Sequence, residues 1–259
     1  MKKTIIPILA ALGITAACQN ITDRVEIHPI QDNAEPRLMP RALFPEAPDS
    51  LIAGLGLEDG IPSSVCAFLV RTQGKEILFD AANGAPDSQL LPTLDSLGVK
   101  PEDIDYIFIT HLHGDHIGGL ATDDSATFPD AQLHINAAEL EAWLAMSQEQ
   151  TGNLRRIIAL YEERLVTFTP EDILPNDIKA IPAYGHTPGH TAFRIGDAVI
   201  AGDIMHGTAL QKDHPEFCAR FDMDKEQSIN SRKELLGYAA EEGLRMYGMH
   251  FPAPYYIEF

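Results

Sequence analysis

Basic residues are scarce in this sequence, and their scarcity limits what the protein can bind. Lysine and arginine together number 19, against 38 aspartates and glutamates, so the formal net charge at pH 7 is -19. Proteins that bind DNA or RNA need clustered basic side chains against the phosphate backbone, which an acidic chain repels. Nucleic acid is therefore not an expected partner.

Cysteine is almost absent. The 259 residues contain Cys18, Cys66 and Cys218, and the first of these belongs to an N-terminal signal described below. One remaining pair is too weak a pattern to predict a disulfide, and two buried free thiols are at least as good an interpretation. Neither Cys66 nor Cys218 lies where we would place a metal ligand.

The apolar run from Ile5 to Ala17 is too short to span a membrane comfortably. It follows the basic start Met1 to Lys3 and ends in small residues directly before Cys18, which is the layout of a bacterial lipoprotein export signal. We therefore expect residues 1–18 to be a signal peptide and the protein to be exported to the periplasm, where Cys18 becomes its lipid anchor to the membrane. Ordinary secretion is the alternative.

The remaining chain divides by composition into an arm and a body. Residues 19–50 contain five prolines among mixed polar residues, a composition that predicts an extended tether, although Leu38, Leu43 and Phe44 could pack on the body. Residues 51–259 have the length of one globular domain, and 45% of the whole chain is hydrophobic, which allows a sizeable core.

The strongest chemical signal is the segment Thr110 to His116, with the sequence THLHGDH. It follows an apolar run that predicts a buried strand. Residues two apart in an extended segment point the same way, so His111 and His113 can bind one ion together. Gly114 lets the chain turn and carry Asp115 and His116 toward a second position. Neutral imidazole and carboxylate suit zinc, and also iron, manganese or cobalt.

Three later strand ends repeat one local pattern, in which an apolar strand, a glycine and a candidate ligand follow one another. The ligands delivered in this way are His190, Asp203 and His250. The expected elements are a hairpin (65–70 and 76–79), helices (88–97, 137–146, 153–165 and 224–242) and strands (104–109, 133–135, 178–183, 192–195, 198–201 and 244–248). This order predicts an α/β fold with two mixed sheets face to face and helices outside.

The seven candidate ligands together resemble the set of the metallo-β-lactamase superfamily, over about residues 60 to 252. The resemblance implies an αββα four-layer sandwich with two divalent metal ions at one edge of the sheets, zinc before iron, manganese or cobalt. It implies that His111, His113 and His190 hold the first ion, that Asp115, His116 and His250 hold the second, and that Asp203 bridges both. His186 is then expected to be structural. Asp80 and Thr110, at strand ends beside the cluster, are expected to orient the ligand histidines.

Within the superfamily, the motifs THLHGDHIGGL, GHTPGHT and GDIMH are most similar to the lactonase and methyl parathion hydrolase branch. Acyl-homoserine lactonases carry a tyrosine shortly after the bridging aspartate, where this chain has His206. An aspartate at position 203, in place of the cysteine or serine of true metallo-β-lactamases, speaks against β-lactam hydrolysis. A homodimer is implied by family likeness alone.

The expected function is hydrolysis of lactones or related small-molecule esters by a hydroxide that the two ions share. Asp115 is the candidate proton shuttle, and His206 is the candidate general acid or hydrogen-bond donor to the substrate. Trp143 and Tyr161 are interpreted equally well as pocket residues or as core aromatics. The alternatives are a phosphotriester hydrolase, a persulfide dioxygenase that uses one iron ion, and a metal-binding protein without turnover.

Overall fold

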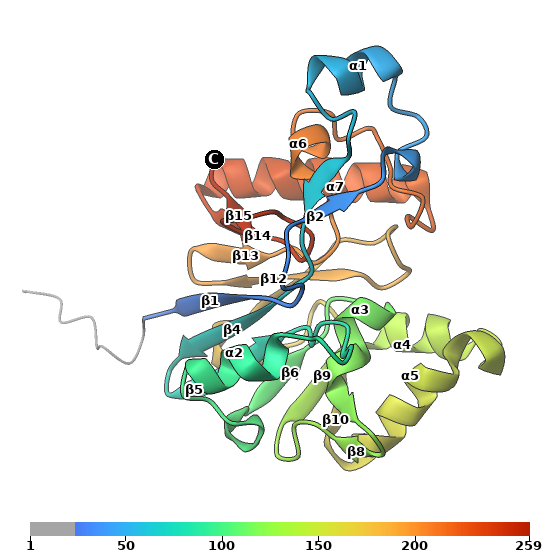
Figure 1. The fold of residues 1–259 in the computed structure, drawn as a ribbon. Coiled ribbons are helices and arrows are strands. Elements are labelled where there is room, and N and C mark those ends of the chain that lie inside the picture. Colours follow the sequence, from blue (N-terminus) through green and yellow to red (C-terminus); the bar gives the residue numbers. More distant parts are fainter. Residues whose placement is uncertain (1–23) are drawn as a thin grey trace, which may run out of the picture.

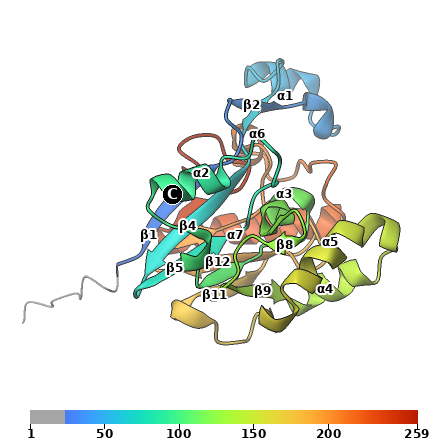
Figure 2. The same ribbon diagram turned by 60° about the horizontal axis from the view of Figure 1, so that its bottom comes forward.

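Two β-sheets lie face to face in the computed structural model, which describes residues 24–259; the predicted signal peptide lies outside the described residues. The first sheet has the strand order β1-β4-β5-β6-β9-β10 and the second β11-β12-β13-β14-β15. Figures 1 and 2 show the two sheets with helices on their outer sides. The strands of the first sheet are β1 (Glu26–Gln31), β4 (Cys66–Thr72), β5 (Lys75–Phe79), β6 (Tyr106–Phe108), β9 (Gln132–Asn136) and β10 (Leu165–Phe168). Those of the second are β11 (Lys179–Pro182), β12 (Thr191–Ile195), β13 (Ala198–Ile200), β14 (Arg245–Tyr247) and β15 (Tyr256–Ile257).

The alternation of side chains along β4 explains why this strand is buried on both faces. Phe68 belongs to the apolar cluster between the two sheets, together with Phe79, Phe108 and Phe193. Leu69 points the other way and belongs to the cluster under the helices of the first sheet. The predicted hairpin is confirmed, since β4 and β5 pair antiparallel around the turn at Gln73 and Gly74.

Helices form the two outer layers. Leu94 of α2 and Ile157 of α5 pack against the first sheet, and Leu235 and Ala239 of α7 pack with Val199 of the second. Figure 1 shows α7 across the second sheet and α2, α4 and α5 on the side of the first. The helices are α1 (Asp49–Gly54), α2 (Leu90–Ser96), α3 (Gly114–Ile117), α4 (Ala137–Leu144), α5 (Gln148–Leu160), α6 (Thr208–Gln211) and α7 (Lys225–Glu242). The predicted four-layer αββα sandwich is confirmed.

Helix boundaries follow capping where the sequence offers a cap. The Asn136 side chain accepts a hydrogen bond from the Ala138 backbone at the start of α4, and Asp224 does the same for Gln227 at the start of α7. The helix predicted over 153–165 instead covers Gln148–Leu160, because the chain from Leu165 pairs with β9 as strand β10.

The prediction of a tether over residues 19–50 is wrong for the described part of that segment. β1 pairs antiparallel with β4 along its whole length, and Pro29 is tolerated there because β1 lies at the edge of the sheet. Strand β2 (Arg37–Met39) pairs with β3 (Ile61–Ser63). Between them, Phe44 and Ile52 are buried in one cluster with Leu210. Residues 24–63 are therefore part of the folded domain, and we call residues 33–63 the N-terminal arm.

Cys66 and Cys218 are both buried and both free, so the described structure contains no disulfide between them. Among residues 24–259, no helix is long and apolar enough to cross a membrane.

His134 is a buried histidine whose ring nitrogens both lack a hydrogen-bond partner. It stacks on Phe108 at 4.5 Å between ring centroids, and burial lowers its pKa to about 4. The folded protein therefore resists protonation of this ring, while the unfolded chain accepts it below about pH 6.5. His134 should contribute a loss of stability as pH falls from about 6.5 to about 4.

We expect His134→Leu to raise the free energy of unfolding at pH 5 by about 1–2 kcal/mol relative to the wild type. At pH 8 the histidine is neutral in both the folded and the unfolded state. The change in the free energy of unfolding at pH 5, minus the change at pH 8, therefore isolates the effect of protonation. Urea melts at the two pH values measure it, and an equal change at both would contradict it.

Candidate metal centre

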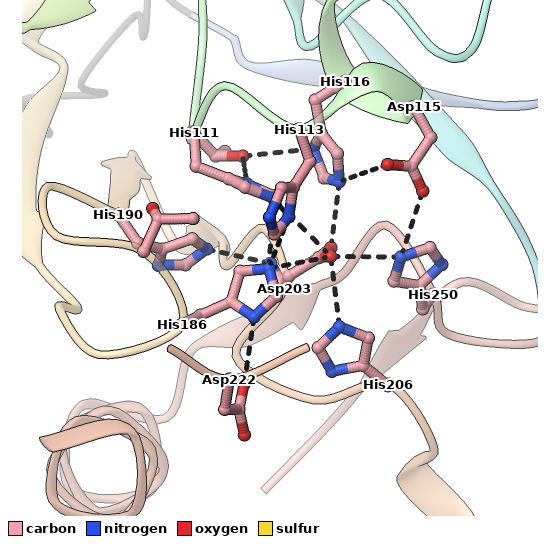
Figure 3. Close-up of polar contacts among 12 residues, drawn as sticks. His111, His113, Asp115, His116, His186, His190, Asp203, His206, Asp222 and His250 are labelled. Carbon is pink, nitrogen blue, oxygen red and sulfur yellow. Dashed lines mark hydrogen bonds and ion pairs between the residues drawn. The ribbon is translucent and has the colours of Figure 1, made fainter. Parts of the chain in front are cut away.

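Strand ends deliver the polar side chains of the site to one edge of the two sheets. His111 and His113 follow β6, and Asp115 and His116 lie in the short helix α3 that continues from them. Asp203 follows β13 and His250 follows β14, two strands that are paired in parallel. The side chains converge on Asp203, as Figure 3 shows.

In the first group of candidate ligands, three histidine ring nitrogens lie within about one hydrogen-bond length of one another. His111 Nε2 lies 2.9 Å from His113 Nδ1, and His186 Nε2 lies 3.2 Å from the former and 3.0 Å from the latter. Asp203 Oδ2 completes the group at 3.4 Å from His186 Nε2. Donor atoms on one tetrahedral zinc ion, at about 2.0–2.1 Å from it, lie roughly 3.3 Å apart. These four atoms have the mutual spacing that one ion requires.

The second group lies on the other side of Asp203. His250 Nε2 is 3.6 Å from Asp115 Oδ2, and His116 Nε2 is 4.0 Å from Asp115 Oδ1. Asp203 reaches this group too, at 3.2 Å from His116 Nε2 and 3.1 Å from His250 Nε2. Asp203 is thus the one carboxylate shared between the two groups in the described chain.

Outer hydrogen-bond acceptors fix which nitrogen faces the centre in His111, His116 and His250. His116 Nδ1 lies 3.0 Å from Asp80 Oδ2, and His250 Nδ1 lies 2.8 Å from the Ser64 carbonyl. Thr110 donates its hydroxyl proton to Asp80 and leaves its oxygen for His111 Nδ1 at 3.1 Å. Because these partners hold the Nδ1 side of each of the three rings, Nε2 is the nitrogen left for a metal ion. Asp80 and Thr110 thus contact ligand candidates at the positions that the expected orienting role requires.

The histidines of the first group are held neutral. Burial lowers the pKa of His113 and His186 to about 4 and that of His111 well below its usual value. In the second group burial acts in the same direction, but the Asp203 carboxylate overcomes it and raises the pKa of His116 and His250. A cation entering there would displace protons, so metal binding is expected to release protons and to weaken as pH falls.

The residues present fit divalent metal ions. His116 Nε2 and Asp203 Oδ1 are buried and have no hydrogen-bond partner, although they are 3.2 Å apart. Buried polar atoms without partners are rare and costly unless an ion satisfies them. Nitrogen and carboxylate donors together favour zinc-like ions. The clusters of histidine and aspartate side chains are therefore suited to hold divalent metal ions.

One predicted ligand requires correction. His190 does not point into either group: its Nδ1 bonds the Ala183 carbonyl at 3.0 Å, and its Nε2 accepts the Asp203 backbone N–H at 2.9 Å. His190 sits where the hairpin between β11 and β12 closes, and Ala183 N bonds its carbonyl in turn. His186, at the tip of that loop, reaches the first group instead. His190 supports Asp203 and His186 is the candidate ligand.

Two variants separate these roles. His186→Ala should reduce bound zinc by about one ion per chain, because it removes a direct donor of the first group. His190→Ala should keep the ion count at saturating zinc but lower the free energy of unfolding by about 2 kcal/mol, since it leaves a buried N–H and a buried carbonyl unpaired. Elemental analysis after dialysis and thermal melts measure both, and the reverse pattern would restore His190 as the ligand.

His206 and the aromatic residues complete the surroundings. His206 Nε2 lies 3.3 Å from Asp203 Oδ2, and its ring stacks on that of His250 at 5.2 Å. Trp143 lies edge-on to His113 at 5.4 Å. Tyr161 is fully buried and donates its hydroxyl proton to the Leu120 carbonyl, so it is a core residue and does not line the pocket.

Three supporting residues have no recognisable signal in the sequence. Asp222 accepts the Nδ1 proton of His186 at 2.9 Å and pairs with Arg232 at 3.1 Å. Arg232 is a fully buried arginine of α7. Glu139 accepts hydrogen bonds from the backbone of Leu112 and Gly189, and so ties together the two loops that carry histidines. None of the three stands in a metal-binding motif, so only the fold reveals them.

The fold and the site together define an αββα protein with a shared-carboxylate metal centre at the sheet edge. The model of the metallo-beta-lactamase superfamily matches residues 60–242, and the chain belongs to this superfamily.

Proteins that are similar to this chain in sequence or structure include a hydrolase and lactonases. The crystal structure of AbOPH, described as a hydrolase in the beta lactamase superfamily, is 28% identical with a TM-score of 0.81, and the match covers 90% of this chain and 89% of that one. AidC, described as a dizinc quorum-quenching lactonase with a bound product, has a TM-score of 0.82 at 24% identity, covering 91% and 90%. The N-acyl homoserine lactonase of Bacillus cereus is 30% identical over 168 residues, which are 58% of this chain and 56% of that protein. The chain spans less than two thirds of the length of the curated relatives that it matches first.

Proposed function

We propose that this protein is a metal-dependent hydrolase that opens lactones or cleaves related carboxylic esters, with one divalent ion in each of the two groups. The observation that carries the proposal is the position of Asp203, within 3.4 Å of donor atoms of both groups. The superfamily, the hydrolase AbOPH and the lactonase of Bacillus cereus support it. Zinc is the proposed metal because histidine nitrogens make up at least half of each donor set and carboxylates the rest.

When bound, such ions polarise a carbonyl oxygen and lower the pKa of water from about 16 toward about 7. The chain's own residues then need to orient the substrate and move a proton. Asp115 is suited to exchange protons with solvent, because its side chain is 36% exposed while that of Asp203 is 2% exposed. His206 faces the same pocket, with Nε2 3.3 Å from Asp203, and is suited to donate a hydrogen bond to the substrate.

One observation favours phosphotriester hydrolysis as a second candidate. Phe221 lies 5.4 Å from His206 and Trp143 lies 5.4 Å from His113, so aromatic rings flank the cluster on two sides. Rings so placed could hold an aromatic leaving group. The same enzyme could carry out both reactions, because both need a polarised oxygen and a water nucleophile.

The location of the protein also stays a proposal. The apolar N-terminal run before Cys18 supports export to the periplasm and lipid anchoring. Cys18→Ser should release the protein from the membrane fraction, and labelling with a radioactive fatty acid checks it directly.

The proposed activity is tested with the chain from Gln19 onward, loaded with zinc, beside the same protein stripped of metal. We expect metal-dependent ring opening of acyl-homoserine lactones with kcat/KM above about 10⁴ M⁻¹s⁻¹. The acid that ring opening releases is the measured signal. A fully loaded protein that opens no lactone but cleaves aryl phosphotriesters would move the assignment to the second candidate. A loaded protein that cleaves neither would contradict the hydrolase proposal.

A further inference from the structure

A cavity of about 260 Å³ opens over the metal centre, and the N-terminal arm forms part of its wall. The centre contributes one side of the lining; Phe221 and, from β2, Arg37 and Met39 contribute the rest. The cavity residues are Arg37, Met39, His113, Gly114, Asp115, Asp203, His206, Phe221 and His250. Arg37 is the one arginine or lysine in this lining, in a chain where acidic residues outnumber basic ones by two to one.

The register of the arm places Arg37 beside the centre. Arg37 lies opposite Ser63 in the pairing of β2 with β3. The Ser63 hydroxyl donates to the His250 carbonyl at 3.2 Å, and the Ser64 carbonyl lies 2.8 Å from His250 Nδ1. Residues two apart on a strand share a face, so Arg37 and Met39 both line the cavity while Leu38 points away. Strand β3, which pairs with β2, thus hydrogen-bonds to His250, a candidate metal ligand.

The guanidinium of Arg37 has no partner of its own. Within residues 24–259, no carboxylate lies within ion-pair distance of it, whereas Arg41 on the same arm pairs with Asp49. The two carboxylates that line the same cavity, Asp115 and Asp203, pair with histidines, and Met39 and Phe221 offer no acceptor. Arg37 is exposed at the wall of the cavity. Its guanidinium can form charge-assisted, two-pronged hydrogen bonds, for which a carboxylate has the matching geometry.

We propose that Arg37 is a specificity-determining residue that binds a carboxylate of the substrate, remote from the bond that is cleaved. The inference rests on the proposed hydrolase function and names its substrate class: small lactones or esters whose acyl part ends in a carboxylate. The cavity has a volume of about 260 Å³, so the acyl part inside it is short. The net negative charge of the chain repels such anions, and Arg37 supplies a local attraction for them.

Binding of two ring-opened lactones that differ only at the acyl end tests the proposal on the zinc-loaded protein. N-succinyl-homoserine carries a terminal carboxylate, and N-butanoyl-homoserine has a methyl group in its place. Calorimetry should show about tenfold tighter binding of the succinyl compound by the wild type. In Arg37→Met the preference should disappear. In Arg37→Lys part of it should remain, because lysine keeps the charge but cannot donate two parallel hydrogen bonds from a planar guanidinium. Arg41→Met is the matched control on the same arm and should keep the preference.

The outcomes separate this proposal from the proposed function. Turnover of the parent lactones, N-succinyl- and N-butanoyl-homoserine lactone, is measured in parallel. If the loaded wild type opens neither lactone but loses its binding preference in Arg37→Met, the lactonase role fails and the Arg37 assignment stands. If the wild type shows no preference, or Arg37→Met keeps it, the Arg37 assignment is overturned whatever the turnover.

Discussion

Replacing Asp203 with asparagine is expected to lower kcat/KM by more than about 100-fold. Loss of a residue that only hydrogen-bonds to a metal ligand lowers activity by about 10–100-fold. Asparagine has nearly the same size, so the packing around this buried position is kept. It removes the charge and turns one oxygen into an N–H donor that faces ring nitrogens at 3.1–3.4 Å. Both groups of donors lose their shared carboxylate at once.

Asp197→Asn is the matched control, because Asp197 is an exposed aspartate in the turn between β12 and β13. Activity and zinc content are measured side by side for the two variants. If Asp203→Asn keeps kcat/KM within about threefold of the control and holds the same amount of zinc, Asp203 does not belong to the metal site.

The substitution with the largest expected effect on stability is Arg232→Met. The buried guanidinium donates to the carbonyls of Ile204 at 2.6 Å and Pro215 at 2.7 Å, and to Asp222 at 3.1 Å. Methionine fills much of the volume but leaves the Asp222 carboxylate buried without its countercharge. Breaking a buried ion pair on one side costs about 3–5 kcal/mol, so the free energy of unfolding should fall by that amount.

The same variant should weaken zinc binding by about 10–100-fold, because Asp222 holds the Nδ1 proton of His186 and Ile204 follows Asp203 directly. The double variant Arg232→Met with Asp222→Asn should recover part of the lost stability, since no buried charge is then unpaired. Urea melts and zinc titrations measure these effects. A double variant less stable than Arg232→Met alone, or a single variant with wild-type zinc affinity, would refute this role for Arg232.

The sequence was sufficient for the fold and for most of the candidate site because their signals are local. His111, His113, Asp115 and His116 fall in one segment after one strand, and their chemistry can be interpreted without knowing the rest of the chain. Alternating and continuous apolar runs marked most strands, and side-chain caps such as Asn136 and Asp224 marked helix starts.

What the sequence could not supply depends on contacts between distant segments. The choice between His186 and His190 depends on how the loop between β11 and β12 closes, where residues 183 and 190 pair and leave 186 at the tip. Residues 19–50 were mistaken for a tether because their prolines suggested an extended chain, while β1 in this segment pairs with β4, about 40 positions away. Arg232 lies on a polar helix, and its partners are distributed over residues 204–228.

The central claim, that Asp203 joins two ion-binding groups, is tested most directly by counting the metal. The protein is stripped of metal, titrated with zinc, dialysed and analysed for zinc per chain, with Asp197→Asn and Asp203→Asn treated alike. The proposed function predicts two zinc ions per chain in the wild type and in Asp197→Asn, with fewer in Asp203→Asn. A wild type that saturates at one ion, or an Asp203→Asn variant that still holds two with undiminished affinity, would contradict the account.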